Sequence, residues 1–290
     1  MTKTVDEGFR IFHSWLTPTA TETAAAKSHR ASIEACLKNN FQITRFFRAG
    51  SFGNGTSIRN FSDVDYFASI PRRHLTDNSD YSLKKVWRVL DERFPDTEVG
   101  IRGPAIWLPF GNDASEQTDV VPADYIKTDD DGFKIYEIAD RSGSWMTTSP
   151  DAHNAYVDYA HQKLANKVKP LVRFIKAWRC YKTVPIFSFY LEMFVSRYAL
   201  SENTIIYSID IKNILKQLWE KDLSAMQDPM GISGYIYPCI SEIKKNEALK
   251  KIETALARAE KARDAEADGR IEDAFYWWNL LFDSEFPSYR

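Results

Sequence analysis

Residues 46–70 constrain this chain more than any other stretch, and they read FFRAGSFGNGTSIRNFSDVDYFASI. An apolar run, a turn rich in Gly and Ser, and a second apolar run follow one another. This order predicts two strands joined by a short helical or irregular segment. Because successive side chains of a strand alternate between faces, we expect Asp63 and Asp65 to share one face, with Val64 and Tyr66 in the packed layer.

The two carboxylates predict a cation site, because like charges held this close repel each other unless a cation lies between them. Mg²⁺ suits hard oxygen ligands, and substrate phosphates complete its shell; Mn²⁺ is the alternative ion. A site for two ions, spaced roughly 3.5–4 Å apart, needs carboxylates from both sides. Asp119 is the predicted third ligand, since it enters a short β-branched strand that we expect Pro122 to end.

The turn before the acids has the composition of a phosphate-binding loop. Gly50 and Ser51 directly follow the first apolar run. Glycine lets the backbone approach a phosphate closely, and the hydroxyls of Ser51 and Thr56 add donors. A turn rich in Gly and Ser is by itself an ordinary turn more often than a binding loop. Its short distance from the acid pair is what favours phosphate binding.

Bulk composition restricts the protein class. A chain of 290 residues has room for one large or two small domains. The formal net charge of −2 argues against a protein that mainly coats nucleic acid. Cys36, Cys180 and Cys239 form no ligand cluster, which predicts reduced thiols in a cytoplasmic protein. The sequence shows no signal peptide and no apolar run long enough to cross a bilayer, so we expect no membrane association.

The periodicity changes near residue 150. Before it, short apolar runs and the amphipathic segment 80–93 predict a mixed sheet with helices. Ser149-Pro150-Asp151 combines a hydroxyl N-cap, a first-turn proline and an acid, which predicts a helix start. Nearly everything after it has helical period, and we expect Pro170 to kink one long helix. The predicted domains are therefore 1–150, a core with an N-terminal helix, and 151–290, a helical lobe.

The first long helical stretch of that lobe is strongly basic. Between Tyr159 and Leu191 there is no Asp or Glu. A solvated basic face normally carries interspersed acids, so the pattern favours a clamp for a nucleotide triphosphate, with the solvated face as the open alternative. Three of the cations share one helical face by their i, i+4, i+7 spacing. The basic residues are Lys163, Lys167, Lys169, Arg173, Lys176, Arg179 and Lys182.

The pattern GS-x₃-GT-x-I-x₃-SDVD, followed by TDVVPA, resembles the nucleotidyltransferases of the DNA polymerase β superfamily. The match is closest to the branch of oligoadenylate synthetases and cGAS/DncV-like enzymes, whose bacterial members (the SMODS type) make cyclic oligonucleotide second messengers. Residues 20–38 also look like the long helix that precedes the GS motif in those enzymes. The resemblance implies an α+β fold: a mixed sheet with helices and a C-terminal helical lobe, with the active site in the cleft between them.

The resemblance also assigns residues in the helical lobe. FIKAW resembles the helix that places a lysine, here Lys176, on the nucleotide phosphates. SFYLE resembles the serine and aromatic that meet a phosphate and a base, here Ser188 and Phe189, with core packing of Phe189 as the alternative. Relatives place part of the base pocket near Trp145. The implied set is catalytic and metal-binding Asp63, Asp65 and Asp119, with nucleotide-binding Gly50, Ser51, Thr56, Lys176, Ser188 and Phe189.

The implied reaction joins nucleoside triphosphates into a cyclic di- or trinucleotide and releases pyrophosphate. The implied setting is anti-phage (CBASS) signalling by a cytoplasmic monomer, whose product a separate effector protein reads, without activation by nucleic acid. Three alternatives stay open: an RNA-activated linear oligoadenylate synthetase, a nucleotidyltransferase acting on tRNA or a small molecule, and a catalytically silent nucleotide-binding module. The motifs leave base choice, ring size, linkage and the activating signal undetermined.

Overall fold

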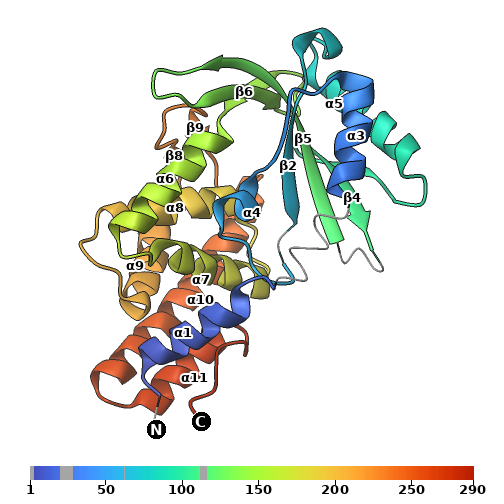
Figure 1. Cartoon of the computed structure of the whole chain (residues 1–290). Helices are drawn as coiled ribbons and strands as arrows, with labels where there is room; N and C mark the ends of the chain where they lie inside the picture. The colour runs from blue at the N-terminus through green and yellow to red at the C-terminus, as the bar shows by residue number, and fades with distance from the viewer. Residues whose placement is uncertain (1–2, 20–28, 62, 112–115) are drawn as a thin grey trace. The chain divides into compact units, whose positions relative to one another are not determined.

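The computed structural model describes residues 3–19, 29–61, 63–111 and 116–290. The chain divides into two compact units, which we call the sheet unit (Pro18–Ala155) and the helical unit (Met1–Thr17 with Tyr156–Arg290). Figure 1 shows a mixed sheet with helices in the first and helices almost alone in the second. The predicted α+β class is therefore confirmed. The sequence division grouped Met1–Thr17 with the sheet, whereas by packing this segment belongs to the helical unit.

The sheet unit is built on a mixed sheet whose described strands run in the order β1-β2-β5-β4-β3. β2 and β5 are parallel neighbours, and every other pairing is antiparallel. β6 pairs with the second half of β5, and β7 pairs with β6. The strands are β1 (Arg45–Arg48), β2 (Val64–Ser69), β3 (Gly100–Arg102), β4 (Ala105–Phe110), β5 (Glu116–Thr128), β6 (Lys134–Ala139) and β7 (Trp145–Thr148).

Pro122 does not end its strand, so that prediction was wrong. β5 continues through it to Thr128. A proline in a central strand normally removes a ladder hydrogen bond. Here β4 pairs with β5 only as far as Val120, and β6 begins to pair at Ala123. Pro122 lies where β5 changes neighbours, so its missing N–H leaves no cross-strand acceptor unpaired on that side.

Two helices cover one face of the sheet and bury its main core. α3 contributes Ile33 and Leu37, α5 contributes Leu83 and Leu90, and both pack against sheet residues such as Tyr66. α5 confirms the helix predicted over 80–93. Of the helix predicted over 20–38, residues 20–28 lie outside the described part of the chain. The helical segments of this unit are α3 (Arg30–Phe41), α4 (Gly50–Asn54), η1 (Arg72–His74) and α5 (Ser79–Arg93).

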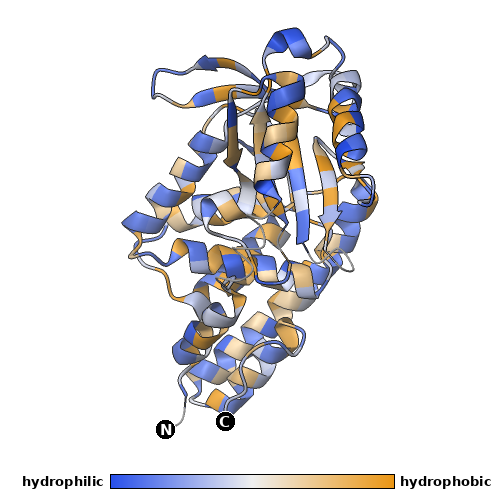
Figure 2. Cartoon of the chain, turned by 45° about the vertical axis from the view of Figure 1, so that its right-hand side comes forward, coloured by the Kyte–Doolittle hydropathy of each residue, from blue (hydrophilic) through white to orange (hydrophobic). Residues whose placement is uncertain are grey.

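The helical unit has an aromatic core. Phe9 and Phe12 of the first helix lie against Phe174, and Phe282 also contacts both. Figure 2 shows the helices banded in apolar orange and polar blue, as expected for helices buried on one side. No described helix is long and apolar enough to cross a membrane. The elements are α1 (Val5–Leu16), α7 (Val168–Tyr181), α8 (Ser188–Leu200), α9 (Tyr207–Glu220), β8 (Met226–Gln227), β9 (Tyr235–Ile236), α10 (Glu242–Ala267) and α11 (Ile271–Leu281).

Helix α6 (Pro150–Lys163) starts in the sheet unit and ends in the helical unit. Its predicted start is confirmed, because the Ser149 hydroxyl accepts a hydrogen bond from the backbone N–H of Ala152 at 3.3 Å. The predicted long helix kinked at Pro170 was wrong. α6 ends at Lys163, and Pro170 lies in the first turn of α7. A proline is tolerated there because first-turn N–H groups have no intrahelical partner.

Candidate active site

Two of the three predicted acids lie on one face of the sheet, and the third directly precedes β2. Asp65 of β2 and Asp119 of β5 are directly paired in the parallel register, so their side chains project from the same face. Asp63 lies directly before β2, and its carboxylate is near enough to Asp119 to raise the pKa of that residue. Val64 and Tyr66, which alternate with the acids, are 6% and 0% exposed, as the alternation predicted. The register therefore brings together carboxylates that are more than fifty positions apart in the chain.

The carboxyl group of Asp119 is strongly perturbed. The pKa of Asp119 is raised to about 7, first by burial and then by the Asp63 carboxylate, while Arg102 opposes the shift. Among the described residues, its buried Oδ1 has no hydrogen-bond partner. A buried acceptor without a partner is costly, and such groups concentrate where a ligand or ion binds. Asp119 is thus prepared for a positively charged or proton-donating partner.

The Gly-rich turn packs directly against Asp65. Gly50 opens α4 with φ of +53°, in the left-handed region that favours glycine. A Cβ at Gly50 would lie 2.0 Å from Oδ2 of Asp65, so no other residue fits between the turn and the acid. Ser51 is half-buried beside it, whereas Thr56 is fully buried. The hydroxyl of Thr56 lies inside the fold, and its contact with a phosphate stays a prediction.

The donor set fits a hard divalent cation, since Asp65 and Asp119 share a face, Asp63 is near Asp119, and a buried oxygen of Asp119 lacks a partner among the described residues. The described side chains do not converge on one point, because no group of three His, Cys, Asp or Glu residues among them is arranged to hold a metal. The Asp65 carboxylate instead lies against Gly50. The ligand type therefore fits Mg²⁺, and the register places two of the ligands on neighbouring strands.

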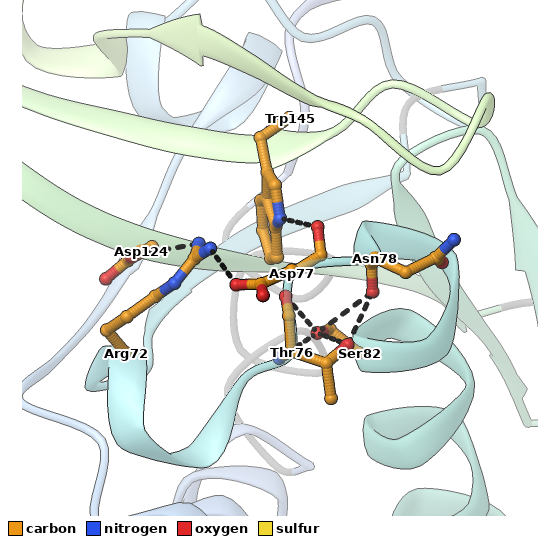
Figure 3. A network of polar contacts seen from close by, with 7 residues as sticks. All are labelled: Arg72, Thr76, Asp77, Asn78, Ser82, Asp124 and Trp145. Atoms are coloured by element: carbon orange, nitrogen blue, oxygen red, sulfur yellow. Dashed lines mark hydrogen bonds and ion pairs between the residues drawn. The ribbon is translucent and has the colours of Figure 1, made fainter.

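Trp145 belongs to a polar network within the sheet unit (Figure 3). Its Nε1 donates to the backbone carbonyl of Asp77 at 3.0 Å, and the Arg72 guanidinium lies 5.1 Å from its ring centroid. Arg72 also contacts Asp124 at 3.4 Å; burial raises the pKa of Asp124, and Arg72 opposes that shift. The network anchors the loop before α5 to β5 and β7, which gives Trp145 a structural role. Its other members are Thr76, Asn78 and Ser82.

The helical unit holds the remaining predicted residues. Lys176 is 3% exposed, and its Nζ donates to Oε1 of Glu192 at 2.6 Å. Its charge is therefore already offset, and its contact with nucleotide phosphates stays a prediction. Ser188 is the first residue of α8. Phe189 is 39% exposed, so core packing does not account for it.

Most of the basic residues between Tyr159 and Leu191 form ion pairs and hydrogen bonds, and the acids among their partners come from outside that stretch. Lys169 pairs with Asp158 at 2.5 Å, and Lys182 pairs with Asp283. The Arg173 guanidinium lies 2.7 Å from Nε2 of His13. Lys167 and Arg179 donate to backbone carbonyls. Most of these cations thus tie the helical unit together, an explanation that the sequence prediction did not include.

Sequence reasoning missed a cluster of side chains that lies next to Asp119 on the same sheet. Trp107 of β4 is the register partner of Asp119, and the Arg102 guanidinium lies 3.6 Å from the centroid of its indole. Gln117 precedes Asp119 by two residues and accepts hydrogen bonds from both side chains. Alternation along β5 could have placed Gln117 on the acid face. Arg102 and Trp107 became recognisable only once the register of β3 and β4 was known.

Comparison with known families settles the family. The model of the Second Messenger Oligonucleotide or Dinucleotide Synthetase domain, SMODS, matches residues 3–160, more than half of the chain. The chain belongs to the SMODS family. The family predicted from the GS and SDVD motifs is thereby confirmed. This SMODS protein is 26% identical over 174 residues to a probable cyclic nucleotide synthase of Bacillus cereus (strain VD146); the match covers 59% of the chain and 52%, about half, of that relative.

Solved structures of similar proteins share the fold of this SMODS protein. CdnC of E. coli MS115-1, solved with ATP, has a TM-score of 0.73 at 17% identity, covering 97% of this chain and 98% of that one. Vibrio cholerae DncV, as a mutant with ATP, GTP and 5MTHFGLU2, has a TM-score of 0.66 at 14% identity, covering 97% and 82%. The predicted polymerase β-like nucleotidyltransferase fold is confirmed.

Proposed function

We propose that this SMODS protein joins nucleoside triphosphates into a cyclic di- or trinucleotide by nucleotidyl transfer. One observation carries the proposal: Asp119 is paired in register with Asp65, and the Gly50 turn packs against Asp65. Carboxylates suited to metal ions therefore adjoin a turn suited to phosphates. Relatives solved with ATP, and with ATP and GTP, support nucleoside triphosphates as the substrate class.

Asp63, Asp65 and Asp119 would hold two Mg²⁺ ions, with Mn²⁺ as the alternative. When bound, such ions lower the pKa of an attacking ribose hydroxyl and neutralise departing pyrophosphate. Gly50 and Ser51 orient the donor triphosphate through backbone N–H groups and a hydroxyl. Lys176, Ser188 and Phe189 are the residues that we propose for the helical side, following the family resemblance.

Asp119 is the group to which we assign the hydroxyl proton, because its Oδ1 is buried and lacks a partner among the described residues. An acceptor of this kind matches its task when its pKa lies near the working pH. As the proton passes to Asp119, the ribose oxygen bonds to the α-phosphorus of the donor. The bond between that phosphorus and the pyrophosphate oxygen breaks in line. The same step, repeated within the linear intermediate, closes the ring.

The wider setting is proposed from the family resemblance. A separate effector protein reads the product in anti-phage signalling. The enzyme acts as a cytoplasmic monomer and needs no nucleic acid for activity, in keeping with its net charge of −2. A requirement for double-stranded RNA would overturn this part of the proposal and favour a linear oligoadenylate synthetase.

Purified protein incubated with Mg²⁺ and all four nucleoside triphosphates tests the proposal directly. We expect phosphatase-resistant products whose masses match a cyclic di- or trinucleotide, and no products when EDTA replaces Mg²⁺. Linear products that phosphatase shortens would indicate the linear synthetase. Products that form only with added tRNA or a small-molecule acceptor would indicate the transferase alternative, and no product at all would indicate a silent module.

A double variant tests the site. Asp63→Asn with Asp65→Asn removes two anionic ligands and should lower nucleotide incorporation by a factor on the order of 10³ or more. The fold should persist, because the change also relieves carboxylate repulsion. Asp130→Asn, at an exposed turn, is the matched control and should behave as the parent. Retained activity in a properly folded double variant would refute the site.

A further inference from the structure

The line of register partners that contains Asp65 and Asp119 extends over four neighbouring strands, and we call this line the acid row. Asp65, Asp119, Trp107 and Gly100 are successive register partners on β2, β5, β4 and β3, so the three side chains project from one face and Gly100 lies in line with them. Adjacent strands are about 4.8 Å apart, which places β3 roughly 10 Å from Asp119. The β3 end of the row lies on the far side of Asp119 from Asp65 and the phosphate turn. A ligand touching Asp119 could therefore reach either end.

Arg102, near the β3 end, is held in a fixed direction. Its guanidinium lies 3.6 Å from the centroid of the Trp107 indole, and its Nη1 donates to Oε1 of Gln117 at 3.3 Å. Trp107 donates from Nε1 to the same oxygen at 3.0 Å. A Cβ at Gly100 would lie 3.3 Å from the indole, so glycine leaves the room that this ring occupies. Stacking and hydrogen bonding together orient Arg102 before any ligand arrives.

The charge of Arg102 has no anionic partner in the described part of the chain, where its partners are an amide oxygen and a ring. The side chain is exposed, so one surface of the guanidinium faces solvent. It is also close enough to Asp119 to oppose the rise in that carboxyl's pKa. An exposed, oriented guanidinium beside a carboxylate row is suited to bidentate binding of a phosphate.

We propose that Arg102 binds the 5′-triphosphate of the acceptor nucleotide. The inference rests on the proposed function, because an acceptor exists only if nucleotides are joined. The donor triphosphate belongs at the Gly50 end of the row, with the carboxylates and their ions. The acceptor presents its ribose hydroxyl at Asp119, so its triphosphate needs a cation on the opposite side. Arg102 lies there, about two strand spacings away, which is within reach of a nucleotide's phosphate chain.

A purely protective role is the competing explanation. β3 lies at an edge of the sheet, and charged side chains often shield such edges and their apolar rings. A protective Arg102 would affect every acceptor equally. A triphosphate-binding Arg102 would matter only when the acceptor carries the triphosphate. This difference gives the test.

The test pairs protein variants with acceptor variants. A 2′,3′-dideoxynucleoside triphosphate serves only as donor, because it has no hydroxyl for attack, and a nucleoside monophosphate serves only as acceptor. Cross-products are measured by mass with acceptor triphosphate or monophosphate. For the parent protein we expect kcat/KM to be about 10–100-fold higher with the triphosphate acceptor. Arg102→Gln should remove that advantage through KM, and kcat/KM for the monophosphate acceptor should change far less.

Two further variants complete the design. Arg102→Lys keeps the charge but loses the planar fork, so it should retain part of the advantage. Arg88→Gln removes an exposed arginine from α5, which packs on the opposite face, and should match the parent. An equal loss for both acceptors in Arg102→Gln, or no loss for either, overturns the proposal.

A binding experiment separates failure of this inference from failure of the proposed function. Inorganic tripolyphosphate is titrated by calorimetry into the protein in EDTA, where bare carboxylates disfavour anions at the Gly50 end. We expect Arg102→Gln to bind at least about tenfold more weakly than the parent and Arg88→Gln. Equal binding by all three overturns the role of Arg102, even if the parent makes cyclic products. A parent that makes no product but shows this binding difference refutes the synthase function and leaves an anion site at Arg102.

Discussion

Two sites of this protein, one in each unit, treat buried charge in opposite ways. In the helical unit, buried Lys176 pairs with buried Glu192 at 2.6 Å, and neighbouring cations find Asp158 and Asp283. In the sheet unit, Asp119 keeps a buried oxygen without a partner among the described residues. Burial and the nearby Asp63 carboxylate raise its pKa to about 7.

This difference separates structural charge from functional charge. In a buried ion pair each charge offsets the other, and removing one member destabilises the fold. A buried carboxylate left without a partner costs stability and is retained where a ligand, ion or proton completes it. The difference therefore supports the proposal that the chemistry takes place in the sheet unit. It also predicts different consequences for variants in the two units.

Asp119→Asn should show the largest effect. We expect activity to fall by a factor on the order of 10³, while stability in EDTA at pH 8 rises by up to about 4 kcal/mol. The pKa of the folded state, about 7, exceeds the ordinary 3.8, so folding is penalised increasingly as pH rises from 4 to 7. Urea unfolding at pH 8 and pH 4 measures this. The stability advantage of the variant should vanish at the lower pH; an advantage that persists there contradicts the assignment.

Lys176→Met tests the opposite case. Removing the Lys176 charge beside buried Glu192 should cost about 3–5 kcal/mol of stability, and adding Glu192→Leu should recover most of the loss. Thermal unfolding measures both changes. The double variant also tests the predicted phosphate contact of Lys176. Restored stability with parental kcat/KM indicates a structural lysine, whereas restored stability with a raised KM for nucleotide indicates phosphate binding.

His13 should give a smaller effect that depends on pH. Burial, then Arg173 and His161, lower the pKa of His13 to about 4 from its ordinary 6.5. The unfolded chain therefore takes up this proton first, so stability is full above pH 6.5 and falls by about 1–3 kcal/mol toward pH 4. His13→Gln should flatten that part of the profile. A stability difference that stays constant from pH 7.5 to 4.5 would show that His13 does not titrate in this way.

Gly50→Ala should have the smallest effect on stability. Its positive φ costs a residue with a Cβ about 1–2 kcal/mol, and the added atom must also displace the Asp65 carboxylate. Gly132→Ala is the matched control, since φ there is +87° but no atom lies within 4 Å of the added Cβ. Both variants should lose stability in chemical unfolding, and Gly50→Ala should lose more, because only its Cβ displaces a carboxylate. Only Gly50→Ala should lose activity; equal activity in the two would show that the turn need not fit closely against the acid.

Much of the sheet unit could be predicted because its signals are local. The alternation that buries Val64 and Tyr66 lies within four consecutive residues, and so does the helix start at Ser149-Pro150. The prediction that Pro122 ends its strand failed because the sequence near Pro122 does not show that β5 changes its neighbouring strand there. The basic stretch was read as a ligand clamp because acids such as Asp283 come from distant sequence.

The change of neighbours at Pro122 has a consequence for how this protein tolerates alteration. Upstream of it, Asp119 is held between β2 and β4; downstream, β5 continues with β6 and β7 as an arm. Insertions at the exposed turn near Asp130 would lengthen the arm without changing the pairing of β5 with β2 and β4 around Asp119. That turn is therefore the place to attach a reporter or an affinity label while leaving the carboxylates undisturbed.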